Sequence, residues 1–168
     1  MLVPEHGFWW TAFFPEDARA AAEARDPGPD TAPLVESLLE LDQAILDALP
    51  LGIYACDVDG QIIRINRRAV ELWGRAPRLH DPAQRFCGSF RVESLEGDFI
   101  PPDQTPMAHA VRAGESFEGV EAVVHNPDGK RWVARVNVAP LRDADGSVIG
   151  AINSRRRCDG VMNFCSNF

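Results

Sequence analysis

The sequence has few cysteines, one lysine and no long apolar run. No stretch approaches the ~20 apolar residues of a membrane span, and the N-terminus has neither the basic start nor the apolar core of a signal peptide. We therefore expect a cytoplasmic protein without a membrane span. None of the cysteines shows CxxC spacing, which excludes a disulfide scaffold and predicts reduced thiols at Cys56, Cys87, Cys158 and Cys165.

Motifs for catalysis and for metal binding are also missing. The chain contains no GxSxG, no P-loop and no GxGxxG, and its histidines do not have the spacing of a zinc site. The pairs Glu118–Glu121 and Asp143–Asp145 are interpreted as solvated carboxylates. The sequence thus predicts no catalytic residue and no metal ligand.

The composition is that of one soluble globular domain, with 45% hydrophobic and 25% charged residues among 168. The formal net charge is −8, and residues 1–50 carry all of it, with ten acids against two arginines. Residues 51–168 are balanced, with 15 basic and 15 acidic side chains. Because an acidic segment repels phosphate backbones, nucleic acid is not expected as a partner.

Composition shifts divide the chain into four parts. Residues 1–30 form an aromatic and Ala-rich leader that ends in the Pro/Gly linker 26–30, and residues 158–168 form an irregular tail. Residues 31–49 read as an amphipathic helix, which Pro50 ends, and residues 50–157 form the compact domain. The apolar stripe of the helix either packs on its own domain or joins two protomers; it consists of Leu34, Leu38, Leu41 and Ile45.

Within the domain the pattern alternates between strands and short helices. Two strands, 52–58 and 62–65, meet at the turn Asp59-Gly60, and a helix over 67–73 begins at the cap Asn66 and ends at Gly74. Residues 75–104 are irregular, and a second helix over 107–113 ends at Gly114. Three strands follow at 120–125, 131–141 and 147–153. The prediction is an α+β fold: a five-stranded antiparallel sheet with helices on one face, preceded by N-terminal helices.

The run ALPLGIYACDVDGQIIRINRRAVELWG resembles the opening of a PAS sensor domain. Later runs resemble the long helix and the closing strands of that fold, and similarity to PAS modules of bacterial sensor histidine kinases covers about residues 44–154. The residues that carry the pattern are Asp57, Gly60, Asn66, Gly74, Gly114 and Gly129. The resemblance implies a non-catalytic sensory module that dimerises, or meets a signalling partner, through the helix at 32–48.

The residues argue against the two cofactors common in this family. Flavin-binding PAS light sensors carry cysteine in an Asn-Cys-Arg-Phe-Leu-Gln run, whereas Cys87 lies in Arg-Phe-Cys-Gly-Ser-Phe. The two asparagines that would hold the flavin ring fall at Val124 and Ala134, and a glutamine falls at Asn153. Haem sensors place their histidine near Asp103, six residues before His109. We expect neither photoactive flavin nor haem, and the cofactor, if there is one, is not identified.

Two further questions stay open at this point. One is whether the apolar residues around the centre of the domain fill a core or line a cavity for a small apolar ligand; they are Trp73, Phe86, Met107, Val111, Trp132, Val136 and Ile152. The other question is whether an effector domain belongs to this sensory module.

After residue 153 the sequence lacks heptads and kinase motifs, and Arg155–Arg157 is interpreted as a solvated charge run. The chain is then a stand-alone module or the truncated sensory region of a two-component histidine kinase. An enzyme on a related helix-on-sheet fold would need a buried pair such as Asp57 beside His125.

Overall fold

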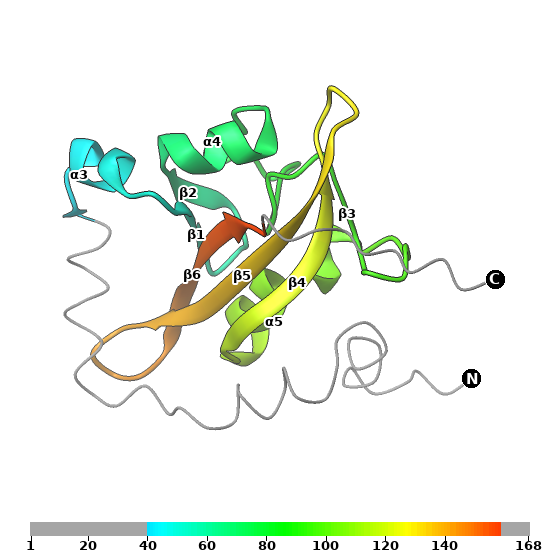
Figure 1. Ribbon diagram of the computed structural model, residues 1–168. Helices are drawn as coiled ribbons and strands as arrows, with labels where there is room; N and C mark the ends of the chain where they lie inside the picture. The colour runs from blue at the N-terminus through cyan, green and yellow to red at the C-terminus, as the bar shows by residue number, and fades with distance from the viewer. Residues whose placement is uncertain (1–39, 159–168) are drawn as a thin grey trace, which may run out of the picture.

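A single antiparallel sheet organises the computed structural model, which describes residues 40–158 (Figure 1). The aromatic leader, Leu34, Leu38 and Cys165 lie outside these described residues. The strand order is β2-β1-β6-β5-β4-β3. The strands are β1 (Gly52–Asp57), β2 (Ile62–Ile65), β3 (Arg91–Glu93), β4 (Phe117–His125), β5 (Arg131–Arg142) and β6 (Val148–Arg157).

The predicted α+β architecture is confirmed, but the expected count of five strands is wrong. Strand β3 pairs with β4, with Arg91 opposite His125 and Glu93 opposite Val123, and so adds a sixth strand at the edge. Three residues are too few to show the alternation that marks a strand in a sequence. In addition, the surrounding segment 75–104 is rich in turn-forming residues, which is typical of a loop.

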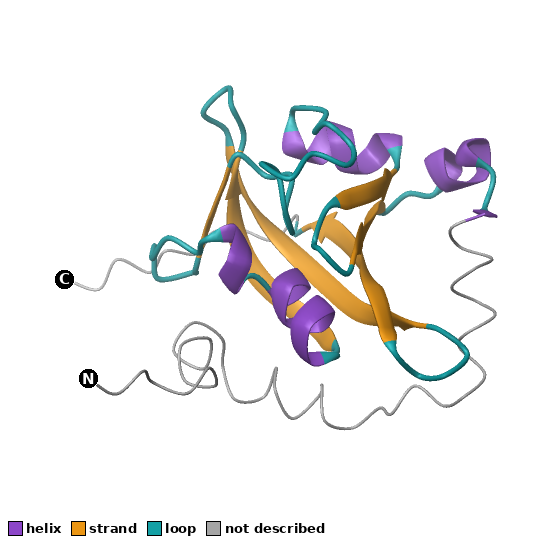
Figure 2. Cartoon of the chain, turned by 180° about the vertical axis from the view of Figure 1, so that it is seen from behind, coloured by secondary structure: helices purple, strands orange, loops and turns teal. Residues whose placement is uncertain are grey.

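The helices gather on one face of the sheet, as predicted. Figure 2 shows α5 (Pro106–Ala113) and the short η3 (Pro102–Gln104) lying across this face, with α4 (Arg67–Trp73) near its upper end. The main apolar core lies between these helices and the strands. Removing this apolar surface from water is the dominant stabilising contribution to such a fold. Its largest fully buried side chains include Tyr54, Trp73, Phe117, Ile62 and Met107.

Turn chemistry accounts for the connections between these elements. Asp57 Oδ1 accepts hydrogen bonds from the backbone N–H groups of Asp59 and Gln61, at 3.0 and 2.9 Å, and so closes the β1–β2 turn. At Gly60, φ is +78°, and any side chain would collide with the Phe86 ring. A residue other than glycine is strained there on both counts. Three more glycines with positive φ end α4, end α5 and turn β4 into β5: Gly74, Gly114 and Gly129.

The N-terminal helix differs from its prediction. A continuous helix over 32–48 is wrong, because Leu41 and Asp42 are not helical and α3 (Gln43–Ala48) begins after them. Asp42 caps α3 by accepting a 2.7 Å hydrogen bond from the Ala44 N–H, and side-chain caps of this kind compete with helix continuation. Leu46 is 3% exposed and docks α3 on the domain, whereas Ile45 of the predicted stripe is 54% exposed. Of the two stripe residues that the structure describes, Leu41 therefore lies outside α3 and Ile45 faces solvent.

Candidate functional site

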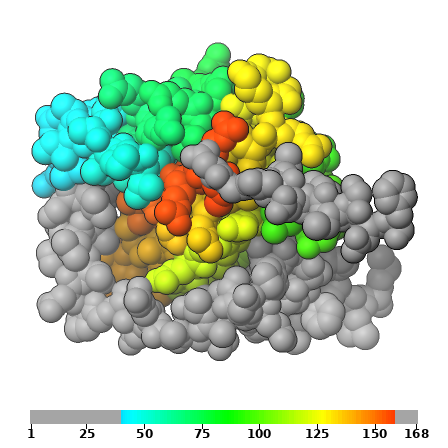
Figure 3. All heavy atoms as spheres, in the orientation of Figure 1, coloured from blue at the N-terminus to red at the C-terminus, as the bar shows by residue number. Residues whose placement is uncertain are grey.

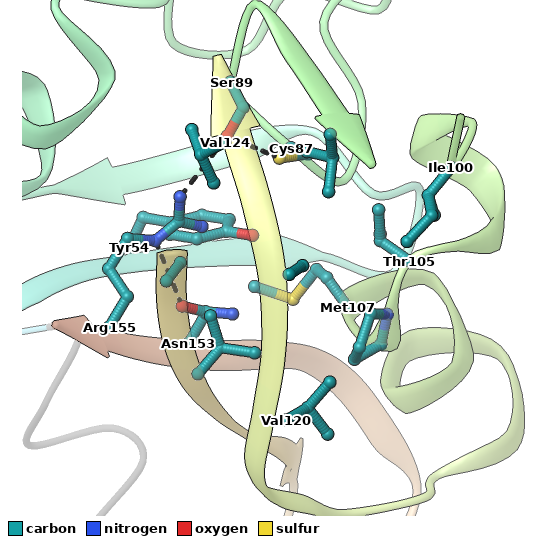
Figure 4. A pocket seen from close by; sticks show the side chains of 15 residues that line it. Tyr54, Cys87, Ser89, Ile100, Thr105, Met107, Val120, Val124, Asn153 and Arg155 are labelled. Carbon is teal, nitrogen blue, oxygen red and sulfur yellow. Dashed lines mark hydrogen bonds between the residues drawn. The ribbon is translucent and has the colours of Figure 1, made fainter. Parts of the chain in front are cut away.

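A cavity opens between the sheet and the start of α5 (Figure 4). Its enclosed volume is about 40 Å³, and the empty space in and around its open mouth amounts to about 440 Å³. Strands β1, β3, β4, β5 and β6 contribute to its wall. Most of the wall is apolar and includes Ile100, Met107, Val120, Val124 and Val136. The polar side chains in the wall are Tyr54, Cys87, Ser89, Thr105, Asn153 and Arg155.

Arg155 dominates the polar end of this cavity. The residue is 3% exposed, and its guanidinium carbon lies 4.7 Å from the centre of the Tyr54 ring and 4.6 Å from that of Trp73. Its Nε donates to Asn153 Oδ1 and its Nη1 to Ser89 Oγ, each at 3.4 Å, which is long for a hydrogen bond. Among the described residues no carboxylate lies within ion-pair distance of it. Arg155 is thus a buried cation held by two aromatic faces rather than by a counter-ion.

The register of β6 explains why an arginine is buried here. In this strand Ala151, Asn153 and Arg155 alternate onto the core face, and Arg155 pairs with Gly52 of β1. A side chain at position 52 would come within 2.9 Å of Arg155 Cγ, so glycine leaves the space that the arginine stem occupies. The interpretation of Arg155–Arg157 as a solvated run is therefore wrong for Arg155. The strand continues through this segment, and strand alternation turns every second residue inward.

Burial keeps two ionisable groups near the cavity, Tyr54 and Cys56, in their neutral form. Burial raises the pKa of Tyr54 well above its ordinary value, and the phenol donates a 2.9 Å hydrogen bond to the Phe86 carbonyl. Burial likewise raises the pKa of the Cys56 thiol, which lies in the core beneath the cavity. The Cys87 thiol donates to Ser89 Oγ at 3.2 Å. Among the described residues, Arg155 is the one charged side chain in the cavity wall.

The structure separates the candidate lining residues into four groups. Met107 and Val136 line the cavity, whereas Trp73, Phe86 and Val111 are buried in the main core without lining it. Trp132 belongs to a second cluster with Leu72, and its Nε1 donates to Asn126 Oδ1 at 3.0 Å. Ile152 packs with Ala55 and Leu141 in a third cluster.

Ile152 lies on the opposite face of the sheet because it is one residue out of phase with Asn153 on β6. The polar lining residues Tyr54, Ser89 and Arg155 were not foreseen, whereas the registration on the flavin sensors had assigned Asn153 to this site. The alternation that continues from Ala151 into the arginines was the available signal for Arg155.

The cavity does not fit a flavin at the positions tested. Val124 and Ala134 do line it, so the sequence registration located these positions in the cavity wall, but they offer no hydrogen bonds to the polar edge of an isoalloxazine ring. Asn153 also lines the cavity, with its carbonyl oxygen directed to Arg155. His109 is not part of the wall, and its ring lies edge-on to Phe117, 6.3 Å between centroids. The described cavity wall contains no histidine, so His109 does not offer a haem in this cavity an axial ligand.

The pair that an enzyme reading required is not formed. Asp57 is used in the β1–β2 turn, and His125 Nε2 lies 2.8 Å from Glu93 Oε2 at the other end of the sheet. Within residues 40–158, no group of three His, Cys, Asp or Glu side chains could hold a metal ion. None of the helices in this part of the chain has the length and apolar character needed to cross a bilayer.

Comparison with known proteins gives a consistent result. The sequence profile of the family described as PAS fold matches residues 46–156. Among curated proteins, none matches the sequence. Solved structures that are similar include a PAS domain from Colwellia psychrerythraea, with 18% identity over 72% of this chain and 97% of that one and a TM-score of 0.51.

Two further solved structures are similar to the same degree. The PAS domain of the fruit-fly ELK potassium channel has 13% identity over 70% of this chain and 94% of that one, with a TM-score of 0.51. A light-oxygen-voltage domain has 18% identity over 71% and 85%, with a TM-score of 0.50. At these identities the likeness concerns the fold alone.

Proposed function

Because the chain belongs to the PAS family, we propose that it is a sensory module whose cavity binds a small molecule and whose helix α3 transmits the resulting change. PAS domains are in general non-catalytic, in agreement with the turn role of Asp57 and the pairing of His125 with Glu93. The proposed output is a second copy of the chain or another signalling protein.

The observation that carries this proposal is the side chain of Asn66, which connects α3 to the strand next to the cavity. Asn66 Oδ1 accepts a 2.8 Å hydrogen bond from Ile53 N–H, and Ile53 adjoins Tyr54 in β1. Asn66 Nδ2 donates to the Leu46 carbonyl in α3 at 3.0 Å. A ligand that displaces Tyr54 therefore acts on α3 through two consecutive short hydrogen bonds, provided that it binds the two positions of β1 with different affinity.

The exposed side of α3 is suited to the output. In the space-filling view α3, in cyan, forms one corner of the surface (Figure 3). Leu46 holds the helix on the domain, while Ile45 and Leu49 are 54% and 38% exposed. Exposed apolar side chains on a docked helix are available to a partner protein. We propose that the module acts in bacterial signal transduction, either alone or as the sensory region of a two-component histidine kinase.

A cavity-filling substitution tests the proposal without knowledge of the ligand. Ala122 lines the cavity on β4, and Ala122→Leu puts three additional carbons into it, as a bound molecule would. Relative to the natural chain, we expect the full-length Ala122→Leu variant to show faster amide hydrogen exchange in residues 43–48. We also expect light scattering to show a change in its oligomeric state. Ala139→Leu, on the exposed side of β5, is the matched control. If Ala122→Leu folds and leaves exchange in α3 at the level of Ala139→Leu, the proposed transmission is wrong.

A further inference from the structure

We infer that the cavity takes a small monocarboxylate, with the carboxylate on the guanidinium of Arg155 and an apolar body against the valines and Met107. The inference rests on the proposed function only in that it concerns the same cavity. It names the chemical class of the ligand, which family membership does not determine.

The first observation is a buried cation that no carboxylate of residues 40–158 pairs with. Burial of an ionised group is costly unless the group is paired, and Arg155 is 97% buried with no carboxylate partner among the described residues. Its two hydrogen bonds, at 3.4 Å to Asn153 and to Ser89, use two of five guanidinium N–H groups, and weakly. A carboxylate ligand would supply the missing charge and accept two parallel N–H bonds.

The second observation is an excess of hydrogen-bond donors around Arg155. Asn153 uses its carbonyl oxygen for Arg155, and no described residue accepts a hydrogen bond from its Nδ2. In Figure 4 this nitrogen is directed away from Arg155, toward the Met107 side of the cavity. The indole Nε1 of Trp73, under the guanidinium, is also buried without an acceptor among the described residues, although Trp73 does not line the cavity. The unpaired amide donor of Asn153 beside a cation is matched by a ligand that only accepts hydrogen bonds, as an ionised carboxylate does.

The remaining wall limits the ligand to one negative charge. Of the lining residues that the structure describes, Arg155 is the charged one, and the rest of the wall is largely Val, Ala, Ile, Met and Pro. A phosphate group carries nearly two charges at pH 7, and a dicarboxylate also carries two, so either leaves a negative charge among apolar side chains without a partner. An apolar body on a single carboxylate instead removes apolar surface of Met107, Val120 and Val124 from water.

The experiment compares acids with their neutral amides on the full chain. The probes are benzoate and isovalerate against benzamide and isovaleramide, with inorganic phosphate as the doubly charged anion. Binding is measured by calorimetry and by the shift in thermal midpoint at 10 mM probe. We expect at least one carboxylate to bind, and its amide and phosphate to bind at least tenfold more weakly, since hydrogen bonds to charged groups contribute that much.

Two variants locate the interaction. Arg155→Met keeps most of the stem but removes the guanidinium, and we expect it to lose carboxylate binding at least tenfold while its thermal midpoint without probe is unchanged or higher. Arg135→Met removes an exposed arginine from the other face of the sheet and should bind as the natural chain does. If Arg155→Met does not fold, the comparison of each acid with its amide on the natural chain decides.

Three results would overturn the inference: no carboxylate effect on the natural chain at 10 mM, equal binding of acid and amide, or full binding by folded Arg155→Met. If the natural chain binds no carboxylate and Arg155→Met has a lowered thermal midpoint, the stacked arginine has a structural role only. None of these outcomes affects the Ala122→Leu test, which uses no ligand. Failure of the ligand class and failure of transmission through α3 are therefore distinguishable.

Discussion

Asn66 is the residue whose replacement we expect to weaken the described domain most clearly. Its side chain is 0% exposed and lies where α3, β1 and the start of α4 meet. Its oxygen accepts from the N–H groups of Ile53 and Ala69, at 2.8 and 3.0 Å. Its nitrogen donates to the carbonyls of Leu46 and Leu51, at 3.0 and 2.8 Å. The amide of Asn66 therefore accepts two hydrogen bonds and donates two, all with backbone groups.

The expected loss in Asn66→Ala follows from the four backbone groups left behind. The bonds to Ala69 N–H and Leu46 C=O are buried. Each of these groups keeps a backbone partner, at 3.1 Å to the Asn66 carbonyl and 3.4 Å from the Leu49 N–H, so losing each side-chain bond costs about 1–1.5 kcal/mol. The other two bonds are part-buried, where water can replace the amide, and each contributes about 0.5–1 kcal/mol. We therefore expect the free energy of unfolding to fall by about 4 kcal/mol. Part of this is the N-cap contribution of Asn66 to α4.

Equilibrium unfolding in urea measures this loss. With a slope of about 1–3 kcal/mol per molar urea, 4 kcal/mol moves the midpoint by about 2 M. The control is Asn137→Ala, since Asn137 is exposed and accepts one hydrogen bond, 2.8 Å from Gly119 N–H. That variant should lose at most about 1 kcal/mol. If Asn66→Ala unfolds within 1 kcal/mol of Asn137→Ala, at unchanged slope, then the amide does not hold the three elements together and the reasoning is wrong.

Three further predictions concern packing and pH. Gly150→Ala should unfold at least 2 kcal/mol more easily in urea, because the new methyl group would collide with the facing β1 carbonyl; a midpoint equal to that of the natural chain would contradict this. Burial lowers the pKa of His109 below its ordinary 6.5, so the unfolded chain takes up the proton first and stability should fall as pH decreases through 6.5. The urea midpoint of His109→Gln should decrease less between pH 7.5 and 5 than that of the natural chain. An equal decrease would show that His109 is not the group responsible. Hydrogen bonds from Arg91 and then His125 lower the pKa of Glu93, whose stabilisation is present above its ordinary 4.5 and is lost as pH falls through the lowered value. In Glu93→Gln the urea midpoint should decrease less as the pH falls below 4.5. An unchanged decrease would show that the hydrogen bonds of Glu93 to Arg91 and His125 do not contribute to stability.

Local patterns predicted the elements but not every boundary. The helix from Arg67 to Trp73 was correct to the residue, because a side-chain cap and a left-handed glycine define its two ends locally. Strand β6 was predicted to end at Asn153 and continues to Arg157, since charged residues read as a strand end when their partners are not known. Pairing with Gly52 and Val136 is what keeps Arg155 in the sheet, and these residues are 103 and 19 positions away.

The sequence alone therefore determined what depends on neighbouring residues: the α+β class, the turns at glycine, the cap at Asn66 and the resemblance to PAS domains. The tertiary structure decided which side chains share the cavity, because that depends on strand phase and on contacts between distant segments. Ile152 and Arg155 show the difference, since a hydrophobic residue lies outside the cavity and a charged one inside it. Alternation along β6 is a local property, but which of its two faces meets the helices is set by the sheet as a whole.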